Sequence, residues 1–296
     1  MYDIVIAGGG PSGLTAAIYA ARAGKKVVVV SETIGGAASS AHNIENFSGH
    51  ISISGFELMQ TMFKQCQNLA VSFITDIISK MELSGDDKII TLYSGERLSS
   101  KKVILAMGAT HKKLGLDGED NLLGQGLSYC ATCDGNFYKG RRVIVNGGGD
   151  TAVSDALFLA PIAKRVTLLH RRQTFRASKH LVDKLKDAGV NLVLDSVITA
   201  LKGAPLISVV VRNVLTQRMT EIETDGLFVA IGVTPNSALV SSEVALNESG
   251  HIITDALMQT NIKDVYAVGD IRNTSLRQII TACADGAIAA ETAFKM

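Results

Sequence analysis

The stretch IVIAGGGPSGLTAAIYAARAGKKVVVV, residues 4–30, decides the fold of this chain. Its first four residues have the continuous apolar pattern of a buried strand, and the four valines at its end have the same pattern. Between them lies a segment with helical periodicity, preceded by a turn with the glycine spacing GxGxxG. A strand, a glycine turn, a helix and a second strand together predict a βαβ unit that binds a dinucleotide.

Each glycine of this turn has its own physical reason. Gly8 makes the tight turn, Gly10 lets the backbone approach a pyrophosphate, and Gly13 allows the helix to pack closely on the strand. The loop also contains Pro11 and Ser12, and the helix that follows directs its N-terminal N–H groups at the anion. A tight turn without a ligand is the alternative, and the complete βαβ context favours the binding site.

The same pattern returns in RRVIVNGGGDTAVSDALFLAPIAKRVTLLHRR, residues 141–172. When Gly147 is placed on Gly8, the two stretches align without a gap, and Gly149 falls on Gly10. After Gly149 the second unit continues with Asp150, Thr151 and Ala152, in register with Pro11, Ser12 and Gly13. The chain therefore contains two nucleotide-binding units.

The residues at the end of each unit's second strand distinguish the two units. The first unit has Ser31 and Glu32 there, whereas the second has a basic run of His170, Arg171 and Arg172. An acid at this place hydrogen-bonds a ribose hydroxyl, and arginines can bind a phosphate through two hydrogen bonds. We therefore predict FAD or NAD in the first unit and NADPH in the second, with Arg176 as a further contact. A solvated charge run is the alternative.

The composition is that of a folded globular protein. Apolar residues make up 47% of the chain and charged residues 19%, and the net charge is +1. Such a charge provides no global field that favours nucleic acid or an anionic membrane. No apolar run approaches the ~18 residues of a membrane helix, and the start MYDIVIAGGG has no basic region typical of a signal peptide. We expect a soluble, cytoplasmic enzyme.

A second motif, SYCATCDGNF at residues 128–137, carries the cysteines Cys130 and Cys133, followed at once by Asp134. Zinc would require four ligands, and no second pair exists among the remaining cysteines, Cys66 and Cys283. A structural disulfide across two residues would constrain little of the unfolded chain. Beside two dinucleotide units, the pair is best interpreted as a reversible dithiol/disulfide. We expect the other two cysteines to be packed free thiols in helices, and we expect no metal.

Two later segments add candidate contacts. DGLFVAIGVTPN, residues 225–236, contains a strand that ends at Gly232, and VYAVGDI, residues 265–271, contains one that ends at Gly269 and Asp270. A glycine and an acid at a strand end can approach and hydrogen-bond a polyol chain; a turn with a helix cap is the alternative. The last helix begins near Arg277, and its N-terminus is another place for an anion.

These motifs resemble the low-molecular-weight thioredoxin reductases, flavoprotein pyridine nucleotide-disulfide oxidoreductases of bacterial type, over essentially the whole chain. In larger disulfide reductases the redox cysteines lie near the N-terminus, whereas here they lie beside the second glycine loop. The motifs that carry the resemblance are GGGPSG, GG at 35–36, IENFSG at 44–49, ILAMGAT at 104–110, CATCDG at 130–135, GGGDTA at 147–152, HRRQTFRA at 170–177, GLFVAIG at 226–232, and AVGDI with RQIIT near the end.

The resemblance implies an α/β fold with two Rossmann-like three-layer nucleotide-binding domains, the second inserted in the first. Residues 1–111 and 237–296 would bind FAD, and residues 112–236 would bind NADPH and carry the CxxC motif. It also implies a homodimer and a hydride path from NADPH to FAD, then to the cysteine pair and thioredoxin. One domain would rotate against the other between the half-reactions, with hinges near 111–113 and 236–238.

Residue roles follow from the resemblance. Cys133 would face the flavin, Cys130 would attack the thioredoxin disulfide, and Asp134 would move the proton. The implied FAD contacts are Gly8, Gly10, Pro11, Ser12, Gly13, Ser31, Glu32, Gly35, Gly36, Ala37, Asn46, Gly108, Ala109, Gly269, Asp270, Arg277, Gln278 and Ile279. The implied NADPH contacts are Gly147, Gly149, Asp150, Thr151, Ala152, His170, Arg171, Arg172, Arg176, Ile231 and Gly232.

One departure and several alternatives accompany this interpretation. Ala37 stands where many relatives have glutamine, which removes one side-chain hydrogen bond near the flavin. The same machinery could serve another disulfide protein, accept electrons from NADH or ferredoxin, oxidise a small dithiol with O₂, or act as a flavin sensor without turnover. The intact GxGxxA and HRRxxxR motifs favour a nicotinamide donor.

Overall fold

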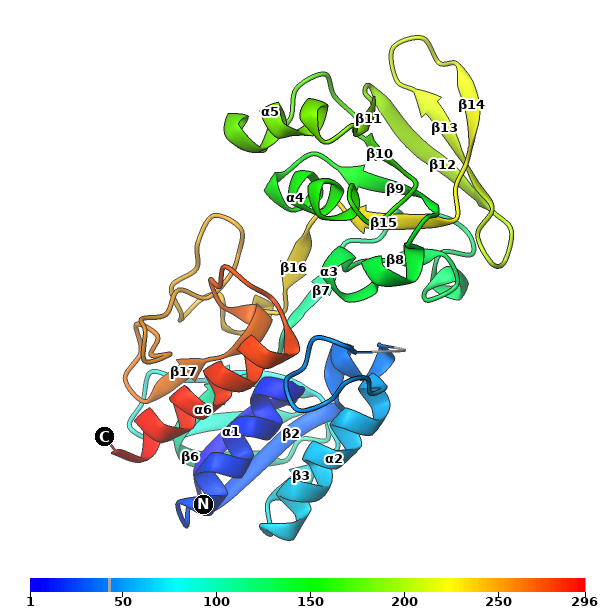
Figure 1. Cartoon of the computed structure of the whole chain (residues 1–296). Helices are drawn as coiled ribbons and strands as arrows, with labels where there is room; N and C mark the ends of the chain where they lie inside the picture. Colours follow the sequence, from blue (N-terminus) through cyan, green and yellow to red (C-terminus); the bar gives the residue numbers. More distant parts are fainter. Residues whose placement is uncertain (42–43, 296) are drawn as a thin grey trace. The chain divides into compact units, whose positions relative to one another are not determined.

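The computed structural model describes residues 1–41 and 44–295, which form two compact units. Unit 1 contains residues 1–110 and the chain from residue 234 onward, and unit 2 contains residues 111–233. In Figure 1 the blue and red ends of the chain therefore belong to one unit, and the green and yellow middle forms the other. Unit 2 is thus inserted into the chain of unit 1.

A seven-stranded sheet forms the centre of unit 1, with the order β3-β2-β1-β6-β5-β4 and β17 also paired with β6. The strands β3, β2, β1, β6 and β17 pair in parallel, and β4, β5 and β6 pair antiparallel. The bounds are β1 (Tyr2–Gly9), β2 (Val27–Ile34), β3 (Ser72–Ile74), β4 (Ile78–Glu82), β5 (Lys88–Leu92), β6 (Arg97–Leu105) and β17 (Val265–Ala267).

Apolar layers cover both faces of this sheet. Ile4 and Ile6 of β1 belong to one buried cluster, and Val5 and Ala7 belong to another. Successive side chains of a strand point to opposite faces, so a continuous apolar run is what a sheet buried on both faces requires. The first cluster holds the helices α1 (Pro11–Arg22), α2 (Gly55–Asn68) and α6 (Ile279–Lys295), which Figure 1 shows on one side of the sheet.

Local signals define these helices. α1 begins with proline at its first position, where the missing N–H costs no hydrogen bond. α2 begins at a capping box in which Ser54 and Glu57 each bind the other's backbone N–H. α1 and α6 pack so closely that a methyl group on Gly286 would lie 2.2 Å from the carbonyl oxygen of Ser12.

Unit 2 is built on a five-stranded parallel sheet of order β11-β10-β9-β15-β8. One face carries α4 (Asp150–Leu159) and α5 (Lys179–Asp187), and Val143 and Val145 point into that cluster. Ile144 points to the other face, against a three-stranded antiparallel sheet. The strands are β8 (Leu127–Ser128), β9 (Arg142–Gly147), β10 (Arg165–Leu169), β11 (Asn191–Val193), β12 (Ser196–Lys202), β13 (Ser208–Asn213), β14 (Met219–Glu223) and β15 (Gly226–Ala230).

Two short connections join the units. β7 (Ala109–His111) and β16 (Val233–Pro235) pair as a two-stranded ribbon. On one side the N–H of Lys112 donates to the carbonyl of Gly232 at 3.0 Å, and on the other the N–H of Asn236 donates to Gly108 at 3.0 Å. Within the described residues no helix is both long and apolar enough to span a membrane.

The strands and helices expected from the sequence are present. The two βαβ units run as β1-α1-β2 and β9-α4-β10, and the helix expected around Cys66 is α2. The last helix, expected to begin near Arg277, begins at Ile279. Each unit has a core of parallel sheet and helices, as the α/β prediction requires.

Candidate active site

The first glycine loop has the close contacts that its spacing predicts. Gly8 has a φ of +111°, and a methyl group there would lie 2.3 Å from the carbonyl oxygen of Ala106. A methyl group on Gly13 would lie 2.0 Å from the carbonyl oxygen of Gly8. Gly10, the residue that precedes α1, has no described atom within 4 Å of its Cβ position. The loop therefore packs tightly at its ends and leaves the middle of its backbone open to a ligand.

Segments distant in the sequence gather around this open backbone. A methyl group on Gly36 would lie 3.4 Å from the Cα of Gly10. The N–H of Gly35 donates to the carbonyl of Gly9 at 2.8 Å. Gly269 has a φ of +72°, and a methyl group on it would lie 2.8 Å from the Oγ of Ser12. The fold thus brings the double glycine and the Gly269–Asp270 turn to the first loop.

The N-terminal end of α6 contributes polar groups to the same unit. The side chain of Asn46 donates to Gln278 at 3.0 Å, although 232 residues separate them in the sequence. Arg277 donates from Nη2 to Nε2 of His251 at 3.1 Å. Burial raises the pKa of Asp270, and the nearby Arg277 opposes that shift.

The guanidinium of Arg277 has a buried donor that the protein does not use. Its Nε has no hydrogen-bond partner in the part of the chain that the structure describes. Buried donors are nearly always paired, so this atom fits a ligand with acceptor oxygens. An open glycine loop, a helix N-terminus and an unused arginine donor together suit the pyrophosphate of a dinucleotide. Ala37 offers only a methyl side chain at the end of the double glycine.

The second glycine loop has a similar backbone. A methyl group on Gly147 would lie 2.3 Å from the carbonyl oxygen of Ala230 and 2.6 Å from the Cβ of Ala152. Gly149 precedes α4 and has no described atom within 4 Å of its Cβ position. The contact with Ala230 places the following residues, Ile231 and Gly232, at the end of the strand beside the loop.

The basic residues beside this second loop fall into two groups, a buried histidine and three exposed arginines. The ring of His170 is 6% exposed, stacks on Phe175 with 5.2 Å between centroids, and lies where a methyl group on Gly148 would be. Burial, and then the charges of the neighbouring arginines, lower the pKa of His170, so its imidazole is neutral at pH 7. The ring of His170 packs against Gly148 and supports the conformation of the loop. The exposed side chains of the run are those of Arg171, Arg172 and Arg176.

Hydrogen bonds tether the arginine segment to the loop. The N–H of Arg176 donates to the carbonyl of Gly148 at 2.8 Å, and the N–H of Ser178 donates to the carboxylate of Asp150 at 2.8 Å. The charges of all three arginines lower the pKa of His170. The second loop therefore has a concentrated positive charge beside its helix N-terminus, where the first has Glu32.

The cysteine pair also lies in unit 2. Cys130 and Cys133 form a disulfide with 5.3 Å between their Cα atoms, across the short helix α3 (Ala131–Asp134). The Sγ of Cys130 accepts a hydrogen bond from the N–H of Cys133 at 3.2 Å and lies 3.4 Å from the hydroxyl of Thr132. Donors aimed at Sγ stabilise a thiolate there once the disulfide is reduced.

The acid beside the pair has a defined partner. The hydroxyl of Ser128 donates to the carboxylate of Asp134 at 2.6 Å and accepts the N–H of Cys130 at 3.0 Å. Tyr129, between them in sequence, stacks on His111 with 5.0 Å between centroids. Its hydroxyl donates to Glu119 at 2.8 Å.

The other two cysteines are free thiols, as predicted. Cys66 is fully buried in α2, and burial raises its pKa to about 12. Burial also raises the pKa of Cys283. Thiols with raised pKa values form little thiolate at neutral pH and are poor nucleophiles. In the described part of the chain, no group of three or more His, Cys, Asp or Glu side chains could hold a metal ion.

Two residues of the site were missed from the sequence. Ser128 lies two residues before Cys130, a spacing at which a serine hydroxyl often binds the backbone, and this signal could have identified it. His251 lies 26 residues from Arg277 in a segment without a motif, so no sequence signal pointed to it.

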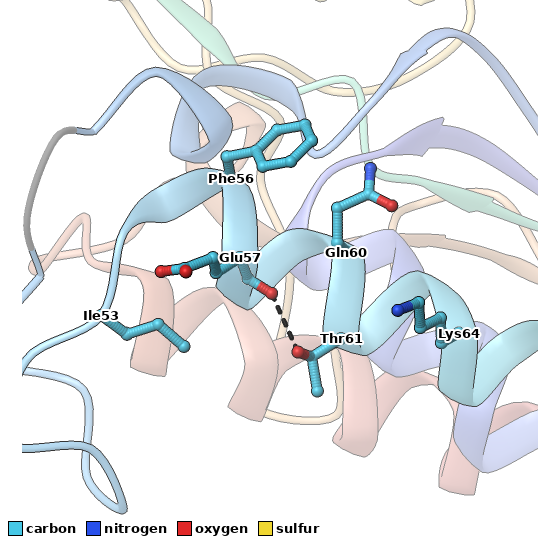
Figure 2. A pocket seen from close by; sticks show the side chains of 6 residues that line it. All are labelled: Ile53, Phe56, Glu57, Gln60, Thr61 and Lys64. Atoms are coloured by element: carbon cyan, nitrogen blue, oxygen red, sulfur yellow. Dashed lines mark hydrogen bonds between the residues drawn. The ribbon is translucent and has the colours of Figure 1, made fainter.

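A surface depression on α2 contains none of the predicted site residues. Figure 2 shows its side chains along α2 and at Ile53, two residues before the helix begins, with the hydroxyl of Thr61 donating to the carbonyl of Glu57 at 2.9 Å. The lining residues are Ile53, Phe56, Glu57, Gln60, Thr61 and Lys64.

Two glycine loops with opposite charge at the strand end, together with a cysteine pair, indicate a redox protein that binds dinucleotides. Comparison with known proteins identifies its family. The family model described as pyridine nucleotide-disulphide oxidoreductase matches residues 2–286, and the chain belongs to that family. It is 41% identical to the thioredoxin reductase of Peptoclostridium acidaminophilum, over 100% of this chain and 96% of that protein. It is 40% identical to the thioredoxin reductase of Streptomyces coelicolor, over 97% of this chain and 91% of that protein.

Solved structures agree with these relatives. The crystal structure of thioredoxin reductase from Streptococcus pyogenes matches with a TM-score of 0.93 at 38% identity, covering 100% of this chain and 97% of that one. Thioredoxin reductase from Giardia duodenalis matches with a TM-score of 0.94 at 30% identity, covering 99% and 98%. The resemblance and the fold with two Rossmann-like domains that were inferred from the sequence are confirmed.

Proposed function

We propose that the chain is a cytoplasmic, NADPH-dependent thioredoxin-disulfide reductase that works as a homodimer. Unit 1 would bind FAD and unit 2 would bind NADPH. The observation that carries the proposal is the content of unit 2, in which the Cys130–Cys133 disulfide and a glycine loop flanked by arginines occur together. The names of the relatives support thioredoxin as the disulfide substrate.

The residues of unit 1 would hold the flavin without large rearrangement. The open backbone at Gly10 and the unused Nε of Arg277 would bind the pyrophosphate, and Glu32 would bind a ribose hydroxyl. Asp270 would bind the polyol chain. When bound, FAD accepts a hydride from NADPH and passes an electron pair to a disulfide.

The chain's own residues would then perform thiol–disulfide exchange. After two-electron reduction, the thiolate of Cys130 attacks one sulfur of the thioredoxin disulfide, forming a mixed disulfide and releasing a thiolate. Asp134 gives that leaving thiolate a proton. The thiolate of Cys133 next attacks the sulfur of Cys130, which re-forms the pair and releases reduced thioredoxin. The N–H of Cys133 that points at the Sγ of Cys130 supports Cys130 as the attacking group.

A rotation between the half-reactions would let the nicotinamide and the cysteine pair reach the flavin in turn. The two connections between the units are short strands, β7 and β16, which are suitable hinges because few backbone dihedrals need to change. The homodimer and the assignment of Cys133 to the flavin rest on the resemblance.

A stepwise anaerobic titration tests this function. NADPH is expected to bleach the flavin absorbance of the purified protein, and oxidised thioredoxin added next is expected to restore it. If NADPH fails while NADH or reduced ferredoxin bleaches the flavin, the electron donor is wrong. If NADPH bleaches it but several disulfide proteins restore the absorbance and thioredoxin does not, the substrate is wrong.

A further inference from the structure

Ser128, the last residue of β8, forms hydrogen bonds with both Cys130 and Asp134. Its hydroxyl accepts the N–H of Cys130 at 3.0 Å and lies 2.6 Å from a carboxylate oxygen of Asp134. A second acceptor, the carbonyl oxygen of Cys130, lies 3.3 Å away. A serine hydroxyl has one hydrogen to donate. The carboxylate of Asp134 is charged and closer than the carbonyl, so it is the stronger acceptor and receives this hydrogen.

Ser128 itself lies in the interior of unit 2. The residue is 1% exposed, and the parallel pairing of β8 with β15 sets its register opposite Phe228. If the hydroxyl were removed, the N–H of Cys130 and the carboxylate of Asp134 would each lose a partner. A hydrogen bond to a carboxylate is stronger than one between neutral groups, so losing the contact with Asp134 would have the larger effect.

We propose that Ser128 is a positioning residue for proton transfer at the cysteine pair. It holds the carboxylate of Asp134 beside the segment that carries Cys130 and stabilises its ionised form. This rests on the proposed function, because it requires that Asp134 protonates the thiolate released in thiol–disulfide exchange. In that step the proton moves from the carboxyl group of Asp134 to the leaving thiolate, and the carboxylate formed accepts the hydrogen bond of Ser128. Solvent returns the proton before the next turnover.

Stabilisation of the ionised form of Asp134 by Ser128 should be visible in the kinetics of thiol–disulfide exchange. Removing a donor from a carboxylate disfavours its charged form, so the midpoint of the pH profile for thiol–disulfide exchange should move to higher pH. The exchange step should slow by roughly tenfold, the usual effect of losing one hydrogen bond to a charged group. Flavin reduction by NADPH should not change, because it does not use Asp134.

Unit 2 contains a matched control. Ser208 on β13 is also almost fully buried, with 2% exposure, and its hydroxyl donates to a carboxylate oxygen of Glu221 at 2.6 Å. Ser208→Ala therefore removes the same kind of interaction from the same unit, but from the antiparallel sheet instead of the cysteine segment. Ser128→Thr keeps a hydroxyl at the first position and serves as the rescue variant.

The experiment measures both half-reactions of the full-length, FAD-loaded protein by stopped flow as a function of pH. Ser128→Ala is expected to show slow exchange and a raised pH midpoint with wild-type flavin reduction, whereas Ser208→Ala and Ser128→Thr are expected to match the wild type. In an Asp134→Asn background, Ser128→Ala is expected to cause no further slowing, because the serine acts through the carboxylate.

Several results would overturn the role of Ser128. One is a Ser128→Ala protein with a wild-type exchange rate and pH midpoint, and another is equal slowing in Ser128→Ala and Ser208→Ala with neither midpoint moved. If Ser128→Ala does not fold, the role of Ser128 would be overturned by a Ser128→Thr protein whose pH profile for exchange has a displaced midpoint. A wild-type protein that is reduced by NADPH but does not reduce thioredoxin would overturn both proposals, so the two failures are distinguishable.

Discussion

The two glycine loops share one sequence pattern but pack differently. In unit 1 the third position must be Gly13, because a methyl group there would lie 2.0 Å from the carbonyl oxygen of Gly8. In unit 2 the same position is Ala152, whose Cβ fits because Gly147 has no side chain to meet it. Gly8 has the left-handed φ of +111°, and Gly147 does not have a positive φ. One glycine pattern thus occurs with two backbone conformations, so the glycines alone do not tell the ligands apart.

The charge at the strand end is where the loops differ in chemistry. Glu32, near the end of β2, stands in sequence register with Arg171, which comes just after β10. The arginine segment is tied back by hydrogen bonds to Gly148 and Asp150, so its charge is held at the loop. The units also differ in their thiols, because unit 1 contains Cys66 and Cys283 as free thiols with raised pKa values while unit 2 pairs its cysteines. Similar frameworks therefore differ in local charge and thiol chemistry through a few side chains.

Exchanging the third loop residue tests the packing difference and has the largest expected effect. Gly13→Ala should destabilise the protein by about 3 kcal/mol, because the new methyl group meets backbone that cannot move away. It should also lower the flavin content of the purified protein. Urea unfolding and flavin absorbance measure both. The matched change, Ala152→Gly, should cost only about 1 kcal/mol from helix propensity. Equal effects at the two positions would contradict the difference in packing.

The charge difference is tested by Arg171→Ala. Loss of one guanidinium–phosphate interaction should raise the KM for NADPH roughly tenfold and leave the KM for NADH unchanged. Steady-state kinetics with both nucleotides measure this selectivity. Arg165→Ala, at the opposite end of β10, is the control and should change neither value. If Arg171→Ala weakens NADPH and NADH equally, the basic run does not recognise the 2′-phosphate.

A smaller effect is expected from the buried histidines, one in each unit. Burial is the main cause that lowers the pKa of His170, and it also lowers that of His251, where Arg277 adds to the shift. Below the unfolded value of about 6.5, the unfolded chain binds protons that the folded state excludes, so stability falls as pH falls towards the lower folded pKa.

Urea unfolding at a series of pH values checks this sign. His170→Gln and His251→Gln should each make the loss of stability on acidification less steep, because each removes one group that takes up a proton on unfolding. A steeper loss in either variant would show that the histidine is charged in the folded state. Thr33→Ala, at an exposed site on β2, is a control for the substitution itself.

Local regularities in the sequence were sufficient for much of the fold. The apolar run before Gly8 and the helical periodicity after Gly13 predicted a strand and a helix, because both patterns are visible within a few residues. The charges of Glu32 and Arg171 were equally visible, because a strand end beside a glycine loop has a known place in a βαβ unit.

Contacts between distant segments could not be predicted in the same way. Asn46 and Gln278 meet only because α6 packs on α1 and brings its N-terminus to the loop before α2. His251 reaches Arg277 for a similar reason, and the division of the basic run into a buried histidine and exposed arginines depends on the packing of Phe175. Such contacts have no period or motif, since they are selected by the three-dimensional packing of whole elements.

The sequence by itself determined the class of fold, the two nucleotide loops with their contrasting charges, and the presence of a redox-capable cysteine pair, because these depend on residue type and short spacing. The tertiary structure decided which side chains complete each site. Only the folded chain shows that Ser128 is almost fully buried and bonded to Asp134, and only packing shows that Nε of Arg277 is left without a partner among the described residues. Hydrogen-bond geometry and exclusion of water are properties of the folded chain, and they turn the residues of a motif into a working site.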